Sequence, residues 1–160
     1  MSAAATSVPS TRTSLLRPIL VGGFLAGTFD LTAAFISFGL GVPRAIAGGL
    51  LGRGALHGGA GTWILGVILH YFIAFSAAAI YCLSSRRLEF LKSHWLVCGI
   101  FYGIAVFLVM QFVVLPLCAL HSMGPYQYRG LVQGLLVHMI IIGLPISLSL
   151  NRLAPRQAGG

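Results

Sequence analysis

Four apolar runs, each about 20 residues long, constrain the fold of this chain more than any other feature. They cover about residues 18–40, 61–83, 95–118 and 130–150. A helix rises about 1.5 Å per residue, so about 20 residues cross the roughly 30 Å hydrocarbon core of a bilayer. Barrel strands are shorter and alternate apolar with polar residues, which these runs do not. The sequence therefore predicts an all-α integral membrane protein, built as an up-down bundle of four helices.

The composition agrees with a membrane domain. Only 8% of the 160 residues are charged, whereas a soluble domain has about 25%. We expect one transmembrane domain over residues 15–152, preceded by a polar, disordered cytoplasmic tail (1–14) and followed by a cytoplasmic tail (153–160). The glycine-rich segment 43–58 is too short to span. A short helix in the outer interface is expected there, and a re-entrant loop is the alternative.

The positive charges are distributed unequally between the two ends of the predicted bundle. The net charge is +8, but the cations lie between or beside the apolar runs, so they indicate membrane topology rather than nucleic-acid binding. Seven fall on the side of the two termini: Arg12, Arg17, Arg86, Arg87, Lys92, Arg152 and Arg156. Three fall on the other side: Arg44, Arg53 and Arg129. The positive-inside rule then places both termini in the cytoplasm.

Three pairs of glycines, each four residues apart, predict close helix packing. The pairs are Gly23 and Gly27, Gly99 and Gly103, and Gly130 and Gly134. Small residues at this spacing let two helix backbones approach within a membrane. The same surfaces could serve a homo-oligomer or a membrane-complex partner. Pro116 is expected to kink or stop the third helix, because proline removes a backbone donor.

Each predicted helix carries one polar residue at a similar depth. Asp30, His70, Gln111 and His138 lie about 15, 14, 11 and 12 Å from the outer ends of their helices, from the rise per residue. Asp30 follows Gly27 by three residues, so it is expected to point into the bundle. Together they predict an intramembrane polar layer.

This layer has several interpretations. The simplest is structural, because buried polar side chains often bond across helices and fix their register. A carboxylate near the bilayer centre costs about 2.5–3.5 kcal/mol to insert, so it needs a partner or a proton. A proton- or ion-linked transporter or sensor that uses Asp30 with His70 or His138 is therefore the second interpretation.

Two cofactor interpretations also stay open. Helices 2 and 4 run parallel in an up-down bundle, so His70 and His138 could be axial ligands of haem b, with Gly66 and Gly134 making room. Asp30, His70 and His138 could instead hold zinc or another divalent metal. No Walker loop, GxSxG elbow or CxxC pair is present, so the sequence favours a non-enzymatic protein.

Several short stretches resemble the YagU-type family of bacterial inner-membrane proteins. They are Leu69 to Ala74 with Tyr81, Gly99 to Leu117, and Leu136 to His138. The resemblance covers helices 2–4 and implies a multi-pass protein of the bacterial inner membrane, whose molecular activity is poorly defined. It gives weight to His70, Pro116 and His138. The first linker is shorter than in that family, and Asp30 matches no acidic residue there.

Overall fold

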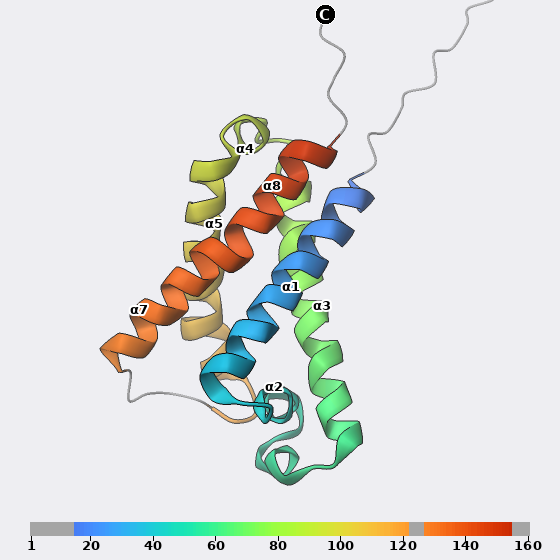
Figure 1. The fold of residues 1–160 in the computed structure, drawn as a ribbon, viewed down its shortest axis with the longest axis vertical. Coiled ribbons are helices and arrows are strands. Elements are labelled where there is room, and N and C mark those ends of the chain that lie inside the picture. Colours follow the sequence, from blue (N-terminus) through green and yellow to red (C-terminus); the bar gives the residue numbers. More distant parts are fainter. Residues whose placement is uncertain (1–14, 122–126, 155–160) are drawn as a thin grey trace, which may run out of the picture.

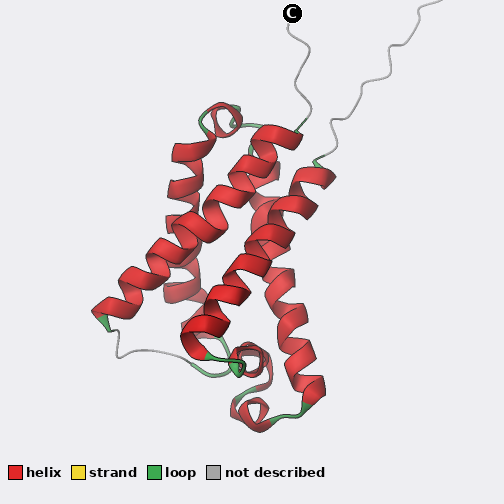
Figure 2. Ribbon diagram, in the orientation of Figure 1, coloured by secondary structure: helices red, strands yellow, loops and turns green. Residues whose placement is uncertain are grey.

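The structure, a computed structural model, describes residues 15–121 and 127–154, and these contain helices and loops but no strand (Figure 2). The elements in chain order are α1 (Leu16–Phe38), α2 (Val42–Leu51), the 3-10 helix η1 (Arg53–His57), α3 (Ala60–Ser84), α4 (Phe90–Ser93), α5 (Trp95–Val109), the π-helix η2 (Met110–Val114), α6 (Leu115–Leu117), α7 (Tyr128–Val137), the π-helix η3 (His138–Gly143) and α8 (Leu144–Leu153).

Four helical stretches are long and apolar enough to cross a membrane. They cover Leu16–Phe38, Ala60–Ser84, Trp95–Leu117 and Tyr128–Leu153, within three residues of the bounds expected from the sequence. The predicted all-α, four-helix fold is therefore confirmed. The predicted tail 1–14 and most of the tail 153–160 lie outside the described residues.

Helix α1 lies at the centre of the arrangement (Figure 1). It packs against α3 on one side and against η3 and α8 on the other, while α5 packs against η3 and α8. One end of the bundle is here called the terminal end. Helix α1 begins there, α8 ends there, and α4 lies beside them. Helix α2 lies at the opposite end, the α2 end. Helices α3 and α7 diverge towards the α2 end, where α2 packs against α3.

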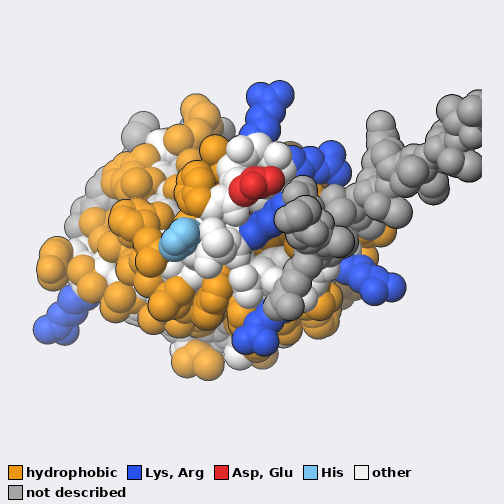
Figure 3. Space-filling view, turned by 90° about the horizontal axis from the view of Figure 1, so that it is seen from above, with side chains coloured by type: hydrophobic (Ala, Val, Ile, Leu, Met, Phe, Trp, Pro, Cys, Tyr) orange, Lys and Arg blue, Asp and Glu red, His pale blue; other side chains and the backbone are white. Residues whose placement is uncertain are grey.

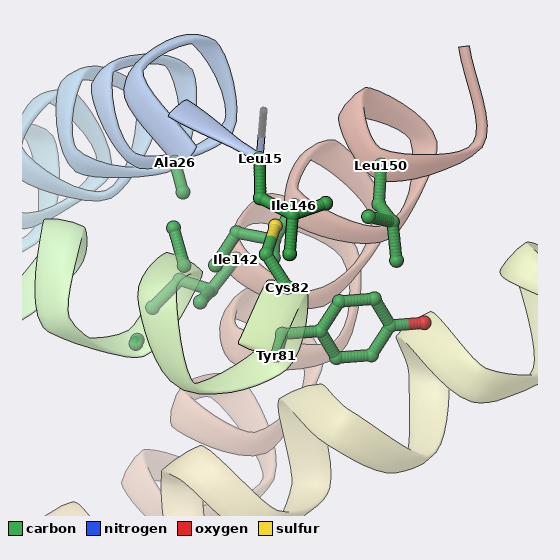
Figure 4. Close-up of a cluster of buried hydrophobic side chains, with 9 residues drawn as sticks. Leu15, Ala26, Tyr81, Cys82, Ile142, Ile146 and Leu150 are labelled. Carbon is green, nitrogen blue, oxygen red and sulfur yellow. The ribbon is translucent and has the colours of Figure 1, made fainter. Parts of the chain in front are cut away.

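The buried core occupies the terminal half (Figure 4). It consists of Leu15, Ala26, Ala77, Ala78, Tyr81, Cys82, Ile142, Ile146 and Leu150. Two tyrosines join α3 to its neighbours here: the hydroxyl of Tyr81 donates to the carbonyl of Leu91 (3.2 Å), and that of Tyr102 on α5 donates to the carbonyl of Ala77 (2.7 Å). The two rings lie 4.8 Å apart between centroids. Each buried hydroxyl is thus paired, as an apolar site requires.

Glycines on α1 allow its close contact with two helices. A Cβ at Gly23 would lie 3.0 Å from the Cα of Phe75, and a Cβ at Gly27 would lie 3.0 Å from the ring of Tyr71, both on α3. On the other side, a Cβ at Gly22 would lie 3.2 Å from the Cα of Ile146 on α8. The absence of side chains at these positions lets the backbones approach.

Glycines of α5 receive the π segment η3 in the same way. A Cβ at Gly103 would collide with the carbonyl of His138, and a Cβ at Gly99 would lie 3.0 Å from the carbonyl of Gly143. Gly143 itself faces the carbonyl of Gly99. The two ends of η3 therefore rest on the Gly99 and Gly103 pair. This contact joins the third and fourth spans.

Both π segments precede a proline by the same offset. η2 ends at Val114, two residues before Pro116, and η3 ends at Gly143, two residues before Pro145. A proline supplies no backbone N–H to the turn before it, and a π turn is one adjustment that keeps the chain helical. The helix continues through Pro116 and ends one residue later, at Leu117.

The third glycine pair, Gly130 and Gly134, behaves differently from the other two. Gly134 lies against the ring of Phe107, 2.9 Å from the position that a Cβ would occupy. Gly130 is exposed, and no atom of the described residues lies within 4 Å of its Cβ position. Gly130 therefore makes no close approach to the described residues, and its packing role stays a prediction.

The expected short helix follows the first span and lies across the α2 end (Figure 1). Gly39 and Gly52 end α1 and α2 with φ of 80° and 83°, values that favour glycine. Helix α2 packs on α3, where Gly66 makes room for the carbonyl of Pro43. The backbone N–H of Ala119 also donates to the carbonyl of Gly49 (2.8 Å). Helix α2 thus ties the first two spans to the link that follows the third.

We predict that Gly103→Ala lowers the melting temperature in detergent far more than Gly130→Ala. A methyl group at residue 103 would push against the backbone of His138, a rigid neighbour, and overpacking of this kind costs about 1–3 kcal/mol. A methyl group at residue 130 meets open space. Thermal denaturation of both variants in the same detergent measures the difference. Equal melting of the two variants would contradict this packing.

Candidate functional site

Asp30 lies on the inner face of α1 and is partly buried. It follows the buried Gly23, Ala26 and Gly27 by seven, four and three residues, so it shares their face. Within the described residues, no side chain or backbone N–H bonds to its carboxylate. The structure thus places a carboxylate on the inner face of a candidate membrane span, without a counter-charge among the residues it describes.

His70 connects α3 to α1. Its Nε2–H donates to the carbonyl of Gly27 at 2.8 Å. The neutral ring therefore has its proton on Nε2, which leaves Nδ1 as the acceptor. The ring of Tyr71 meets that of His70 edge-on, with centroids 5.6 Å apart, and the hydroxyl of Tyr71 bonds to that of Thr28 at 2.9 Å. These two adjacent residues make polar bonds to α1 within one turn of Asp30.

His138 is held within its own helix. Its Nδ1–H donates to the carbonyl of Gly134 at 2.8 Å, one turn earlier. Its ring lies edge-on to that of Phe107 on α5, with centroids 5.5 Å apart. The remaining nitrogen, Nε2, has no hydrogen bond from the described residues. His138 therefore faces α5, whereas His70 faces α1.

Contacts between the helices set the relative heights of these residues. Gly22 meets Ile146 across the antiparallel pair α1 and α8. Asp30 lies eight residues from Gly22, and His138 lies eight residues from Ile146, both towards the α2 end. Asp30 and His138 are therefore at the same height in the bundle. His70, bonded to Gly27, is at nearly the same height.

Gln111 lies outside this level. It is eight residues beyond Gly103, which contacts His138, so it is about 12 Å closer to the α2 end. Three of the four residues expected in a polar layer thus share a height. They nevertheless make no direct bond to one another among the described residues.

This geometry gives little support to a shared cofactor. The two imidazoles face different helices, and α1 packs between α3 and η3. A haem held by both histidines would need the two rings to face each other across one iron. The space beside the two glycines that were expected to make room for a haem is already filled. Pro43 lies against Gly66, and Phe107 lies against Gly134. Within the described residues, His, Cys, Asp and Glu side chains also form no group of three or more placed to hold a metal.

Comparison with known protein families, curated proteins and solved structures finds no match.

The sequence did not single out three polar residues that connect the helices. Tyr102 joins α5 to α3 at the terminal end, and Gln133 on α7 donates to the hydroxyl of Ser37 on α1 at 3.0 Å. Asn151 donates to the carbonyl of Lys92 at 2.6 Å. Tyr102 directly precedes Gly103, where two helix backbones meet. This position in the sequence is the one signal that could have indicated that Tyr102 bonds across helices.

We predict that His70→Phe destabilises the protein more than His138→Phe. The first change removes a bond between two spans, and such bonds are worth about 0.6–2 kcal/mol in membranes. The second removes a bond within one helix, to a carbonyl that the backbone N–H of His138 also bonds. Melting in detergent measures both. His57→Phe, at an exposed residue of η1, is the control that should change little.

Proposed function

We propose that this chain is a small, non-enzymatic, multi-pass membrane protein in which Asp30 binds a proton or a small cation. The observation that supports this proposal is the unpartnered carboxylate on the inner face of α1. A carboxylate at membrane depth is unfavourable unless it is neutralised. Since no basic side chain of the described residues pairs with Asp30, a proton or a cation from outside the chain would neutralise it.

The position of Asp30 supports exchange with a compartment. The core of buried residues lies in the terminal half, and the helices diverge beyond Asp30 towards the α2 end. Two histidines at the same height each retain one ring nitrogen that can accept a proton. A proton-linked carrier or sensor that opens towards the α2 end is the activity consistent with these groups.

A purely structural role is the second candidate. Two polar bonds join α1 to α3 around this height: His70 to Gly27 and Tyr71 to Thr28. A third bond, from Gln133 to Ser37, joins α1 to α7 closer to the α2 end. Bonds of this kind fix the register of membrane helices. This candidate explains the histidine and the tyrosine, but it assigns no role to Asp30.

The resemblance of the second to fourth spans to the YagU-type family supports a bacterial inner membrane as the location. The charge distribution supports an orientation. Arg17, Arg86, Arg87, Lys92 and Arg152 belong to the terminal end, whereas Arg44, Arg53 and Arg129 belong to the α2 end. With the positive-inside rule, we propose that the terminal end is cytoplasmic.

We predict that Asp30→Asn removes proton exchange. Proteoliposomes that enclose a pH-sensitive dye should dissipate a pH gradient with the wild-type protein and should behave as protein-free liposomes with Asp30→Asn. Asparagine keeps the shape but cannot carry a proton. Glu89 is the only other acidic side chain of the chain and is exposed, so Glu89→Gln is a matched control that should exchange protons normally.

A chemical readout separates binding from transport. A hydrophobic carbodiimide adds to a protonated carboxyl group in apolar surroundings and raises the intact mass by one reagent. The wild type and Glu89→Gln should gain this mass, and Asp30→Asn should not. Labelling without flux would indicate a sensor rather than a carrier. Neither labelling nor flux in the wild type would leave the structural role as the better account.

The orientation has its own test. In a variant whose three cysteines are replaced, we predict that a new thiol at Arg53→Cys reacts with a membrane-impermeant maleimide in intact cells. A thiol at Arg87→Cys should react only after lysis, because it lies at the proposed cytoplasmic end. Both residues are exposed, so accessibility within the protein is matched. The reverse pattern would show the opposite topology.

A further inference from the structure

A groove opens at the terminal end, between the end of α3, helix α4 and the first turns of α5. It encloses about 600 Å³, within the usual range for ligand sites. Its lining is mainly apolar and aromatic, with Leu88, Phe90, Val97 and Phe101 among the residues that form it. The hydroxyls of its two tyrosines already bond to backbone carbonyls. The groove therefore offers an apolar surface with few open polar groups.

The depth of the groove matches the upper part of a lipid leaflet. The third span begins at Trp95. Phe90, on the lining, precedes it, and Phe101 lies six residues into the helix, about 9 Å along the axis. The groove thus extends from the membrane boundary into the region of acyl chains. An apolar groove at this depth is suited to an acyl chain rather than to a soluble ligand.

The rim of this groove is basic. Arg86 and Arg87 lie in the short link between the lining residues Ser84 and Leu88. Lys92 follows the lining residue Leu91, and Glu89 is the single acidic residue of this link. Figure 3, seen from above, shows several Lys and Arg side chains around this end. Three cations against one anion favour a negatively charged headgroup.

We propose that this groove binds an anionic phospholipid of the adjacent leaflet. One acyl chain occupies the apolar lining, and the phosphate headgroup lies at Arg86, Arg87 and Lys92. The apolar lining gives retention and the basic rim gives selectivity for charge. The groove lies at the terminal end, whereas Asp30 lies beyond the middle of α1 towards the α2 end, so the lipid site does not depend on the proposed proton site.

The two tryptophans of the chain allow a direct test. Trp95 begins α5 beside the lining residue His94, and Trp63 bonds to the carbonyl of Leu40 at the α2 end. The variant Trp63→Phe leaves Trp95 as the single fluorophore. It is reconstituted in phosphatidylcholine vesicles with increasing fractions of phosphatidylglycerol brominated on its acyl chains. The same titration with brominated phosphatidylcholine gives the reference, because bromine quenches tryptophan fluorescence only at short range.

We expect brominated phosphatidylglycerol to reach half-maximal quenching of Trp95 at a membrane fraction at least about fivefold lower than brominated phosphatidylcholine does. About fivefold is the preference that one favourable Lys or Arg contributes to the binding of an anionic lipid. The variant Trp95→Phe, which reports from Trp63, should show no such preference. In the Trp63→Phe background, Arg86→Gln with Arg87→Gln and Lys92→Gln should abolish it. Ser84→Phe on α3 and Val97→Phe on α5 each place bulk in the groove and should weaken it with all charges intact.

Equal quenching of Trp95 by the two brominated lipids would overturn the proposal. So would a preference that both groove-filling variants retain, since that result would indicate charge attraction at the membrane surface without a bound chain. The two filling variants come from different helices, so a folding defect in one leaves the other informative. Proton exchange by Asp30, measured in the same vesicles, should not change in any of them.

Discussion

The fold depends on close backbone contact between helices at glycines. In lipid, the hydrophobic effect gives no preference for helix against helix over helix against acyl chain, so association relies on packing and on hydrogen bonds. Helix α1 presents Gly22 to α8 and Gly23 with Gly27 to α3, and α5 presents Gly99 with Gly103 to η3. Three of the four spans are joined through α1, and α5 joins the fourth span through a second glycine surface.

These contacts explain why the spans pack most closely in the terminal half. Most of the buried glycines and alanines of the four spans lie in the terminal half, where the tyrosine pair and the buried cluster also lie. Beyond this half, the inner faces carry larger or polar side chains such as Asp30, His70 and Gln111, all partly buried. Large side chains keep the helices apart, so the polar residues lie where the close packing ends. The shared height of Asp30, His70 and His138 is thus a consequence of the packing as well as a candidate site.

The sequence predicted the number of helices, their bounds and most of the close approaches, because these depend on local composition and spacing. It could not predict how each helix is rotated about its axis. His70 and His138 share a height, as expected, but one faces α1 and the other faces α5. The height of Gln111 was misjudged because depth was counted from the end of each helix as if all four helices ended at one height, whereas the contact of Gly103 with His138 fixes the register of the third and fourth spans directly. The central place of α1 depends on which of the other helices pack against it. The sequence of one helix alone does not determine its packing partners.

One of the two π segments lies where the glycine contacts and the polar residues meet. Both lie two residues before a proline, and η3 starts at His138, the residue level with Asp30. A π turn is wider than an α turn, and such turns recur at functional positions in helices. In this chain the widened turn rests on Gly99 and Gly103, where no side chain separates the two backbones. The glycine contact therefore holds the third and fourth spans together at the height of Asp30 and His138, where the close packing of the terminal half ends.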